Sequence, residues 1–357
     1  MGLHRQRRIS LAAVGFVGLT VAVLFLGQPT GVGAAGVGTT KEATKTVGAT
    51  GVGAASTSFT AYVGSGSPAS LGSVSKTMGY KITTALDGFA RKSWSGIDDD
   101  MWVIERWKGT GYHMIWYVPM LPDGGGVSLA TGAAGAYNDH FVLLAQHLVS
   151  AGMGDSVLRL GWEFNQSKYP WYAAGQPTNF VAYWRQIVTA MRSVPGANFT
   201  FEWNPSRGDN GPKNQGMGNL ADYYPGNDYV GIIGMDVYDS AWDYYPGATG
   251  EFHKILTQRW GLNWLASFGA DHDKPIAIPE LGLGSGPSTR GSRPLVANGQ
   301  VSGGDDPTFI SDMLNWVAHN NVVNLAFWDF QSSSIQNGRD PLAAKALRTA
   351  LHRDLDK

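Results

Sequence analysis

The segment LRLGWEFN (residues 158–165) begins as a short apolar strand and ends in a glutamate and an asparagine. A second segment, IAIPELG (276–282), has the same form, because its apolar strand also ends in a single glutamate. In parallel α/β barrels the functional side chains come from the carboxyl ends of the strands. The two segments therefore place Glu163 and Glu280 on one face of such a fold.

Strands and helices are predicted to alternate along the rest of the chain. The expected strands cover residues 59–63, 80–86, 112–119, 156–162, 198–204, 229–238, 275–279 and 322–330. The clearest helices are expected at 137–151, 177–193, 251–270, 307–320 and 341–353. Eight strands alternating with helices within about 300 residues favour a (β/α)8 TIM barrel. A doubly wound sheet is the alternative fold, but no glycine-rich dinucleotide motif follows the first strand.

The N-terminal segment is predicted to lie outside this barrel. Three arginines among the first eight residues precede an uncharged apolar run of 19 residues, Ile9–Gly27, and small residues follow it. This order is typical of a secretory signal peptide, although the run is also nearly long enough to anchor the chain in a bilayer. Both alternatives place the barrel outside the cytoplasm. The predicted domains are 1–35, a signal peptide or anchor; 36–57, a flexible Gly/Ala/Thr linker; and 58–357, the catalytic barrel.

Composition excludes several classes of protein. The chain has 27 Lys+Arg against 28 Asp+Glu, a net charge of -1, and it has no cysteine. It is therefore neither a generally basic nucleic-acid binder nor a protein with disulfides, a thiol nucleophile or a thiolate zinc site. The sequence contains no H-E-x-x-H and no G-x-S-x-G motif, so a metallohydrolase and a serine esterase are unsupported. No metal and no cofactor are expected.

Two glutamates at facing strand ends match the requirements of glycoside cleavage. One carboxyl must be protonated to donate to the leaving oxygen, and the other must be ionised to attack the anomeric carbon or activate water. Either glutamate alone could be a structural ion pair or a helix cap. Because the fourth and seventh strands face each other across the barrel mouth, Glu163 and Glu280 together predict a catalytic pair.

Aromatic side chains near the predicted strand ends could stack on the apolar faces of sugar rings. The expected platforms are Trp203 and Trp328 at strand ends, with Trp171 in the loop after the fourth strand. An abundance of tryptophan (13 residues) beside a charged fraction of only 15% suits a polar but uncharged ligand. These residues predict a polysaccharide as the binding partner.

Three further residues are candidates for support of the carboxylates. Tyr238 and Arg159 could each hydrogen-bond the carboxylate of Glu280 and keep it ionised. For Arg159, a structural ion pair beneath the site is an equal alternative. Asp236 could point into the barrel, or it could cap the loop that follows its strand.

Four motifs, in this order, make the chain resemble glycoside hydrolase family 26. They are R-x-x-x-E-x-N at 159–165, WNP at 203–205, YPGNDYV at 224–230 leading to DVYD at 236–239, and PIAIPELG at 275–282. The resemblance spans about residues 59 to 350 and implies a retaining (β/α)8 enzyme of a family made up mostly of β-mannanases, with some β-glucan and β-xylan hydrolases. It implies Glu163 as the acid/base and Glu280 as the nucleophile. It also implies that Tyr238 contacts the nucleophile and that Trp328 forms the floor beneath the cleaved sugar.

The sequence departs from this family around the acid/base. Trp162 stands where the family usually has His, Phe164 where it has Met, and Gln166 where it has Gly. Asp329 follows Trp328, where the mannanases often carry Arg. These changes surround positions expected to bind sugar, among which we include Trp162 and Asn165, and they leave both carboxylates in place.

The expected function is that of a secreted, monomeric, retaining endo-β-glycosidase acting on β-mannan or a related hemicellulose. A β-1,3/1,4-glucanase or xylanase with the same site is an alternative substrate assignment. A different class is a non-catalytic glycan-binding barrel at the cell surface, in which Trp162 misplaces Glu163. A structural envelope protein would neither bind nor hydrolyse glycan. No nucleic acid is expected as a partner, and membrane contact only through the N-terminal segment.

Overall fold

The computed structural model describes residues 57–208, 217–239, 248–283 and 305–355. The predicted targeting segment, 1–35, and all but the last residue of the predicted linker lie outside the described residues. The chain divides into two units at residues 50 and 51, and the second unit contains every element described below. None of the described helices combines the length and the apolar character needed to cross a membrane.

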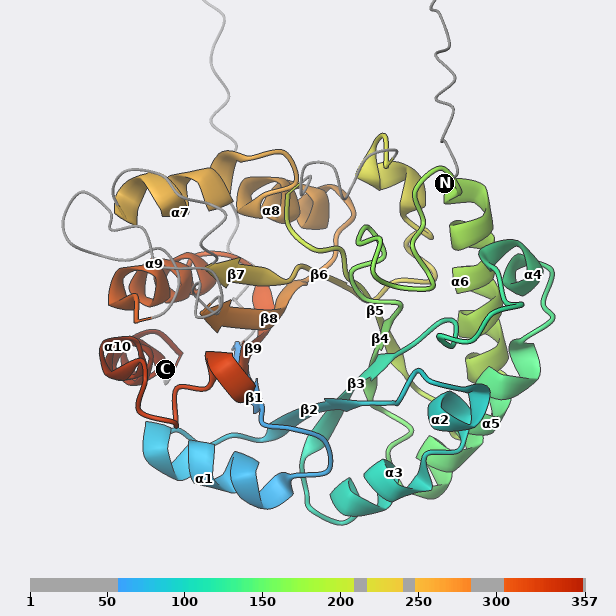
Figure 1. Cartoon of the computed structure of the whole chain (residues 1–357), viewed down its shortest axis with the longest axis horizontal. Coiled ribbons are helices and arrows are strands. Elements are labelled where there is room, and N and C mark those ends of the chain that lie inside the picture. The colour runs from blue at the N-terminus through green and yellow to red at the C-terminus, as the bar shows by residue number, and fades with distance from the viewer. Residues whose placement is uncertain (1–56, 209–216, 240–247, 284–304, 356–357) are drawn as a thin grey trace, which may run out of the picture. The chain divides into compact units, whose positions relative to one another are not determined.

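Parallel strands surround a common centre, with the helices outside them (Figure 1). The strands are β1 (Ser58–Tyr62), β2 (Thr84–Gly88), β3 (His113–Val118), β4 (Val157–Leu160), β5 (Thr200–Trp203), β6 (Ile232–Gly234), β7 (Val237–Asp239), β8 (Ile276–Leu283) and β9 (Val322–Trp328). Both β6 and β7 pair with β8 and fall within the single strand predicted at 229–238, so the nine segments fill eight barrel positions. The predicted (β/α)8 fold is confirmed.

The barrel is nearly closed. Its hydrogen-bonded order runs β1-β9-β8-β6-β5-β4-β3-β2, so β1 and β2 lie at the two ends of the ladder. These two strands nevertheless contact each other, and the Thr60 hydroxyl donates a hydrogen bond of 2.6 Å to the Thr84 carbonyl oxygen. A side-chain bond thus joins the strands where the backbone ladder is open.

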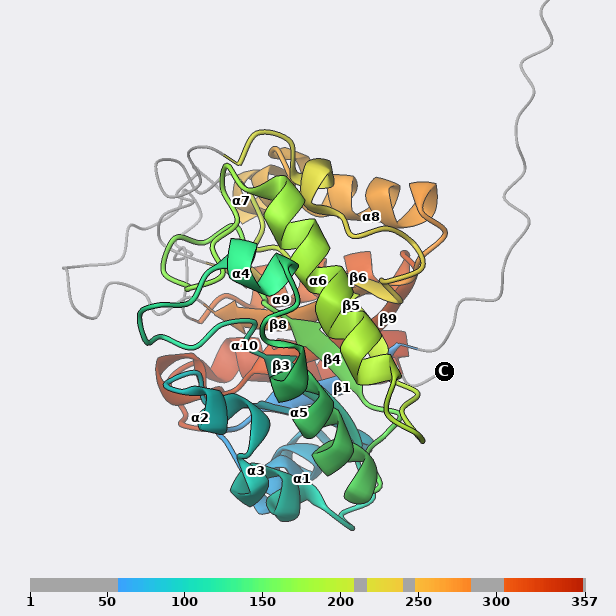
Figure 2. The ribbon, with the colours of Figure 1, turned by 90° about the vertical axis from the view of Figure 1, so that its right-hand side faces the viewer.

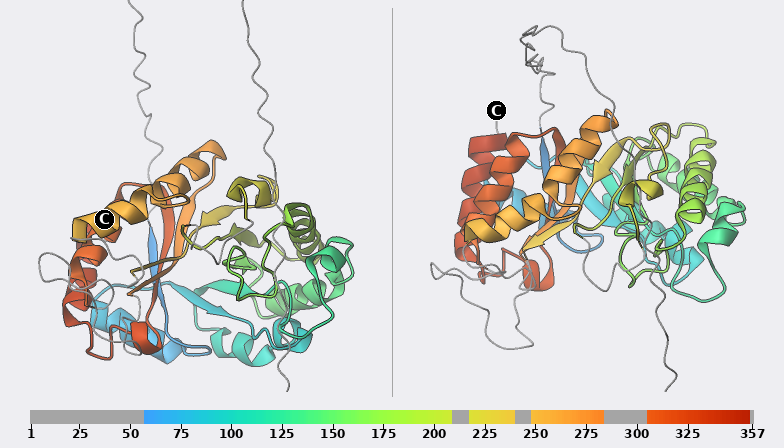
Figure 3. Two further views of the ribbon diagram at one scale, coloured as in Figure 1. Left: turned by 45° about the horizontal axis from the view of Figure 1, so that its top comes forward. Right: turned by 90° about the horizontal axis from the view of Figure 1, so that it is seen from above.

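The helices lie outside the sheet and follow the strands along the chain. They are α1 (Pro68–Met78), α2 (Trp94–Asp98), α3 (Met101–Trp107), α4 (Leu129–Ala133), α5 (Asn138–Ser150), α6 (Pro177–Arg192), α7 (Ala248–Thr257), α8 (Leu262–Asp271), α9 (Pro307–Ala318) and α10 (Pro341–Ala350). Short 3-10 turns occupy Leu220–Tyr223 and Gln331–Ser333, and a π-helical turn follows α10 at Leu351–Leu355. Figure 2 shows α5 and α6 side by side, and Figure 3 shows α9 beside α10.

Four of the five predicted helices are confirmed, and the fifth, 251–270, is wrong as a single helix. The chain forms α7 and α8 instead, separated at Trp260 and Gly261. Trp260 has a positive φ of 55°, which no α-helix contains. A side chain at Gly261 would collide with the carbonyl oxygen of Ile255, so this glycine allows the sharp turn. Because apolar residues recur at helical spacing on both sides of the turn, the sequence pattern predicts one continuous helix.

Alternation along each strand separates two apolar layers. Outward residues such as Leu158 on β4 and Phe201 on β5 pack in the larger core against the helices. Inward residues fill the barrel; these are Tyr62, Leu86, Ile115, Val157, Ile232, Ala277 and Ala326. The next inward positions on β4 and β5 are Arg159 and Glu202, both buried. An ionic layer therefore lies directly on the apolar floor of the barrel.

Candidate active site

A strained turn lifts Glu163 from the end of β4 to the mouth of the barrel. Gly161 and Glu163 have positive φ angles of 48° and 49°, and the backbone N–H of Glu163 donates to the carbonyl oxygen of Asn204 at 2.7 Å. Non-glycine residues adopt this conformation at a cost, and such strain gathers at functional sites. At Gly161 a side chain would collide with the Met120 sulfur and would lie 3.2 Å from Cδ1 of Trp171.

Glu163 receives its contacts from the loop that follows it. Tyr169 donates its hydroxyl hydrogen to Oε2 of Glu163 at 3.0 Å, and Lys168 Nζ lies 2.9 Å from the same oxygen. The indole N–H of Trp162 donates to the Tyr169 hydroxyl at 3.0 Å. Trp162 is itself largely buried, with 8% of its surface exposed. It therefore acts on Glu163 through Tyr169, in a chain of two hydrogen bonds.

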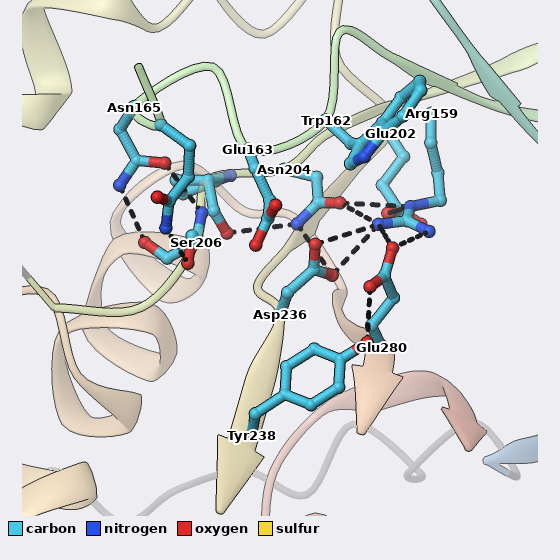
Figure 4. A network of polar contacts seen from close by, with 12 residues as sticks. Arg159, Trp162, Glu163, Asn165, Glu202, Asn204, Ser206, Asp236, Tyr238 and Glu280 are labelled. Carbon is cyan, nitrogen blue, oxygen red and sulfur yellow. Dashed lines mark hydrogen bonds and ion pairs between the residues drawn. The ribbon is translucent and has the colours of Figure 1, made fainter. Parts of the chain in front are cut away.

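Glu280 is held from two sides within β8 (Figure 4). The Tyr238 hydroxyl donates to Oε2 at 2.7 Å, and Nη1 and Nη2 of Arg159 each donate to Oε1 at 3.2 Å. The pairing of β8 with β9 shifts register between Ile278 and Leu281, around Glu280. Gly282 faces the Tyr238 ring, which a side chain there would strike.

The pKa of Glu280 reflects opposing influences. Burial raises it, and the nearby charge of Glu163 raises it further. The positive charge and hydrogen bonds of Arg159, together with the hydrogen bond from Tyr238, lower it, but burial has the largest effect and the pKa of Glu280 lies above its usual value. Because hydrogen-bond donors favour the charged form of a carboxyl group, these contacts counteract the effect of burial on Glu280.

Arg159 is the hub of the site and has no exposed surface. Its Nη2 donates to both oxygens of Asp236, at 3.0 and 3.2 Å, as well as to Glu280. Its Nε lies 3.2 Å from Oε1 of Glu202, and Nε and Nη2 both donate to Oδ1 of Asn204. Burial lowers the pKa of Arg159, and the three carboxyl groups more than offset that effect, so its pKa lies above the usual value.

Aromatic rings line the barrel mouth beside this network. Trp328 is half-buried and stacks on Tyr62, with ring centres 4.2 Å apart and planes inclined by 23°. Tyr62 meets Tyr117 edge-on at 5.9 Å, and Tyr117 meets Trp162 at 5.1 Å. These rings form a continuous wall from β9, across β1 and β3, to the end of β4. Trp328 is therefore placed where a sugar platform was predicted.

Two other predicted platforms are wrong. Trp171 and Trp203 have no exposed surface, so neither ring offers a face to a sugar. Trp203 follows the inward-facing Glu202, and alternation therefore turns it toward the helices, where it packs against Phe164 at 5.2 Å. Trp171 packs against Trp162 and donates to that residue's carbonyl oxygen at 2.8 Å. Both tryptophans support the site from behind.

Asn165 is also buried, and it joins two loops rather than reaching a ligand. Its Nδ2 donates to the carbonyl oxygen of Ser206 at 2.8 Å, and its Oδ1 accepts the Ser206 backbone N–H at 2.9 Å. These two bonds use both ends of the amide and tie the loop after β4 to the loop after β5. The prediction that Asn165 contacts sugar is therefore replaced by a structural role.

The structure thus brings together Arg159, Asp236, Tyr238 and Glu280 as one connected group, with Glu163 beside it. Sequence reasoning missed Glu202 as a member, although its position between outward-facing Phe201 and Trp203 was a usable signal. It also missed Tyr169 and Lys168, whose loop carries no period that would orient them. Among the described residues, no group of three or more His, Asp or Glu side chains is arranged to hold a metal ion.

Comparison with known proteins supports the resemblance drawn from the motifs. The family model "Glycosyl hydrolase family 26" matches residues 145–270, which include Arg159, Glu163 and Tyr238. The suspected resemblance to this family is thereby confirmed. No curated protein matches the sequence.

Solved structures share the barrel at low sequence identity. A modular endo-β-1,4-mannanase from Cellulomonas fimi is 19% identical over 78% of this chain and 65% of its own, with a TM-score of 0.54. A family 26 β-mannanase from Bacteroides ovatus is 16% identical over 84% and 89% of the two chains, with a TM-score of 0.51. A fungal β-1,4-galactanase is 14% identical over 72% and 79%, with a TM-score of 0.50. At these identities the likeness establishes a common fold.

The turn before Glu163 generates a stability prediction. Gly161→Ala should destabilise the protein by about 1–2 kcal/mol for the left-handed backbone and by about 1–3 kcal/mol more for the collision with buried Met120. Gly111→Ala is the matched control, since Gly111 also has a positive φ of 82° but no atom would lie within 4 Å of its new side chain. Urea unfolding of both variants measures the difference. Equal losses would show that the space around Gly161 does not matter.

Proposed function

We propose, from the match to glycosyl hydrolase family 26 and the paired carboxylates, that this protein is a retaining endo-β-glycosidase acting on β-mannan or a related hemicellulose. Glu280 attacks the anomeric carbon while Glu163 donates a proton to the leaving glycosidic oxygen. The glycosyl-enzyme is then hydrolysed by a water molecule that Glu163 deprotonates. The single observation that carries the proposal is the different environment of the two glutamates.

That difference supports the proposed roles. Glu280 accepts hydrogen bonds from Arg159 and Tyr238, which favour an ionised nucleophile fixed in one orientation. Glu163 has no contact with Arg159 among the hydrogen bonds and ion pairs of the described residues, and its partners are Tyr169 and the exposed Lys168. A carboxyl with such partners is freer to exchange a proton with substrate and water.

The proposed substrate class rests on the wall of aromatic rings at the barrel mouth. Trp328, stacked on Tyr62, supplies an apolar surface for one sugar ring at the barrel mouth. β-Mannan is the first choice because the two similar family 26 structures named above are mannanases. β-Glucan and xylan are the alternative substrates, since Trp162 replaces the family's usual histidine at the acid/base.

One contact favours a second candidate function, a glycan-binding barrel without turnover. Lys168 Nζ lies 2.9 Å from Oε2 of Glu163, so it occupies an oxygen that proton donation to the leaving group would need. The side chain of Lys168 is 60% exposed, however, and exposed ion pairs contribute little. Bound substrate can therefore displace it. Binding of glycan without release of product would support this second candidate.

The catalytic pair is tested by product analysis on mannan, glucomannan, mixed-linkage glucan and xylan. The full chain should release oligosaccharides from one of these, and Glu280→Ala should release none. Glu163→Ala should lose about 10²–10⁴-fold on polysaccharide yet retain the first step on aryl glycosides with good leaving groups, which need no proton. Glu105→Ala is the control for loss of a surface glutamate, with 52% of its side chain exposed. Normal turnover by both active-site variants would contradict the pairing.

The indole of Trp162 generates a separate prediction. Trp162→Phe removes the N–H donated to Tyr169, so the orientation of Glu163 should weaken and kcat should fall about 5–10-fold, the equivalent of one hydrogen bond. Trp162→His restores a ring N–H and should recover part of that loss. Steady-state kinetics on the preferred glycan measure both variants. An unchanged kcat in Trp162→Phe would mean that this chain of hydrogen bonds does not position Glu163.

We further propose that the chain is exported and that residues 1–35 direct its export. Mass spectrometry of protein from the culture medium should find a chain that begins just after Ala34 or Ala35. Full-length protein in the membrane fraction would support the anchor instead. Full-length protein confined to the cytoplasm would contradict export altogether.

A further inference from the structure

Glu202 lies inside the barrel, below the proposed catalytic carboxylates, and only 1% of its surface is exposed. Although Arg159 Nε lies 3.2 Å from its Oε1, that N–H donates to Asn204, and Oε1 of Glu202 receives no hydrogen bond. The carboxyl also lies against Gly234, where an added Cβ would be 2.7 Å from the same oxygen and 3.0 Å from Pro279. Glu202 is thus tightly enclosed.

The charges around Glu202 do not balance if every group is ionised. Arg159 supplies one positive charge from β4, and it is faced by three carboxyl groups: Glu202 on β5, Asp236 between β6 and β7, and Glu280 on β8. Glu163, at the mouth, adds a further carboxyl that interacts with Asp236 and Glu280, and Tyr238 is a hydrogen-bond donor to Glu280. An unpaired buried charge is costly, so the cluster must retain a proton.

The hydrogen bonds indicate which carboxyl holds that proton. Glu280 accepts from Arg159 and Tyr238, and Asp236 accepts from Arg159 and from Nδ2 of Asn204 at 3.3 Å. Donors of this kind favour the charged form of a carboxyl group. Burial, and then the charge of Glu280, raise the pKa of Asp236 as well. Both oxygens of Asp236 nevertheless accept hydrogen bonds from Arg159, whereas Oε1 of Glu202 has no such donor, so neutrality costs Glu202 least.

We propose that Glu202 is a positioning residue that carries a proton while the enzyme works, so that its neutral carboxyl leaves Arg159 free to hold Asp236 and Glu280. Burial, and then the charge of Glu280, raise the pKa of Glu202 from 4.5 to about 7, although Arg159 opposes the rise. When Glu202 ionises, it competes with Glu280 for the guanidinium. The effect on catalysis rests on the proposed function, whereas the proton on Glu202 does not.

A direct test is the pH dependence of stability in Glu202→Gln, whose amide imitates the neutral carboxyl. Because the pKa of Glu202 is raised on folding, its protonation stabilises the fold fully below about pH 4.5, and this contribution is lost as pH rises through about 7. In urea unfolding of the full chain, the stability of the variant relative to the wild type should therefore increase between pH 5 and pH 8. A pKa rise from 4.5 to about 7 corresponds to a gain of up to about 300-fold in the folding constant. Glu105→Gln is the surface control and should show no such gain.

The infrared spectrum supplies a second test, which needs no variant to fold. At pH 6 the wild type should show the carbonyl stretch of a protonated carboxyl, which weakens by pH 8. Labelling with ¹³C-glutamate should shift that band, which separates it from any band of Asp236. In Glu202→Gln the band should be lost, whereas Glu163→Gln, which removes the proposed proton donor, should keep it. Absence of a glutamate band in the wild type would overturn the proposal.

Two stability outcomes would also overturn it. If Glu202→Gln loses most stability at pH 8, Glu202 is an ionised partner of Arg159. If the variant and the wild type share one pH dependence, Glu202 takes up no proton on folding.

The kcat profile tests the positioning role itself. The pH at which kcat falls on the alkaline side should be higher in Glu202→Gln than in the wild type. Identical pH profiles of kcat in the two proteins would contradict the positioning role. If the wild type turned over no glycan, the proposed function would fail, while the unfolding and infrared results would still decide the protonation of Glu202.

Discussion

A single buried guanidinium holds the centre of this barrel together. Arg159 is enclosed on all sides, and carboxyl groups from three neighbouring parts of the sheet converge on it. Without a cation, those carboxyl groups would repel one another in a region where water cannot solvate them. Arg159 lies on β4 at the next inward position after Val157, and its two hydrogen bonds to Glu280 orient that carboxyl group.

The same arrangement gives the two glutamates the different surroundings on which the proposed roles rest. Glu280 lies in the ionic layer and is clamped by Arg159 and Tyr238, whereas Glu163 is lifted toward the mouth by a turn that requires Gly161. Two identical side chains can serve as nucleophile and proton donor only when their surroundings differ. Here the difference comes from backbone conformation as much as from charge. Trp162 stands where glycoside hydrolase family 26 usually has histidine, and its indole N–H reaches Glu163 through Tyr169.

Much of this architecture follows from local sequence. Short apolar strands separated by amphipathic helices indicated the barrel, and strand ends located Glu163 and Glu280 because parallel strands present their carboxyl ends together. Alternation placed Arg159 inward. The prediction of Trp203 as a sugar platform is wrong because its neighbour Glu202 faces inward, so Trp203 faces the helices. Tyr169 and the break at Trp260 depend on loop conformations that no periodic pattern encodes.

The dependence of the site on Arg159 is tested most directly by a double-mutant cycle between Arg159 and Glu280. Urea unfolding would be measured for the wild type, Arg159→Gln, Glu280→Gln and the double variant. Since the two side chains share hydrogen bonds at 3.2 Å within one buried network, we predict a coupling free energy of about 1–3 kcal/mol. Effects that add to within about 0.5 kcal/mol would contradict the account. Arg159 would then be only one of several independent contributors to the barrel interior.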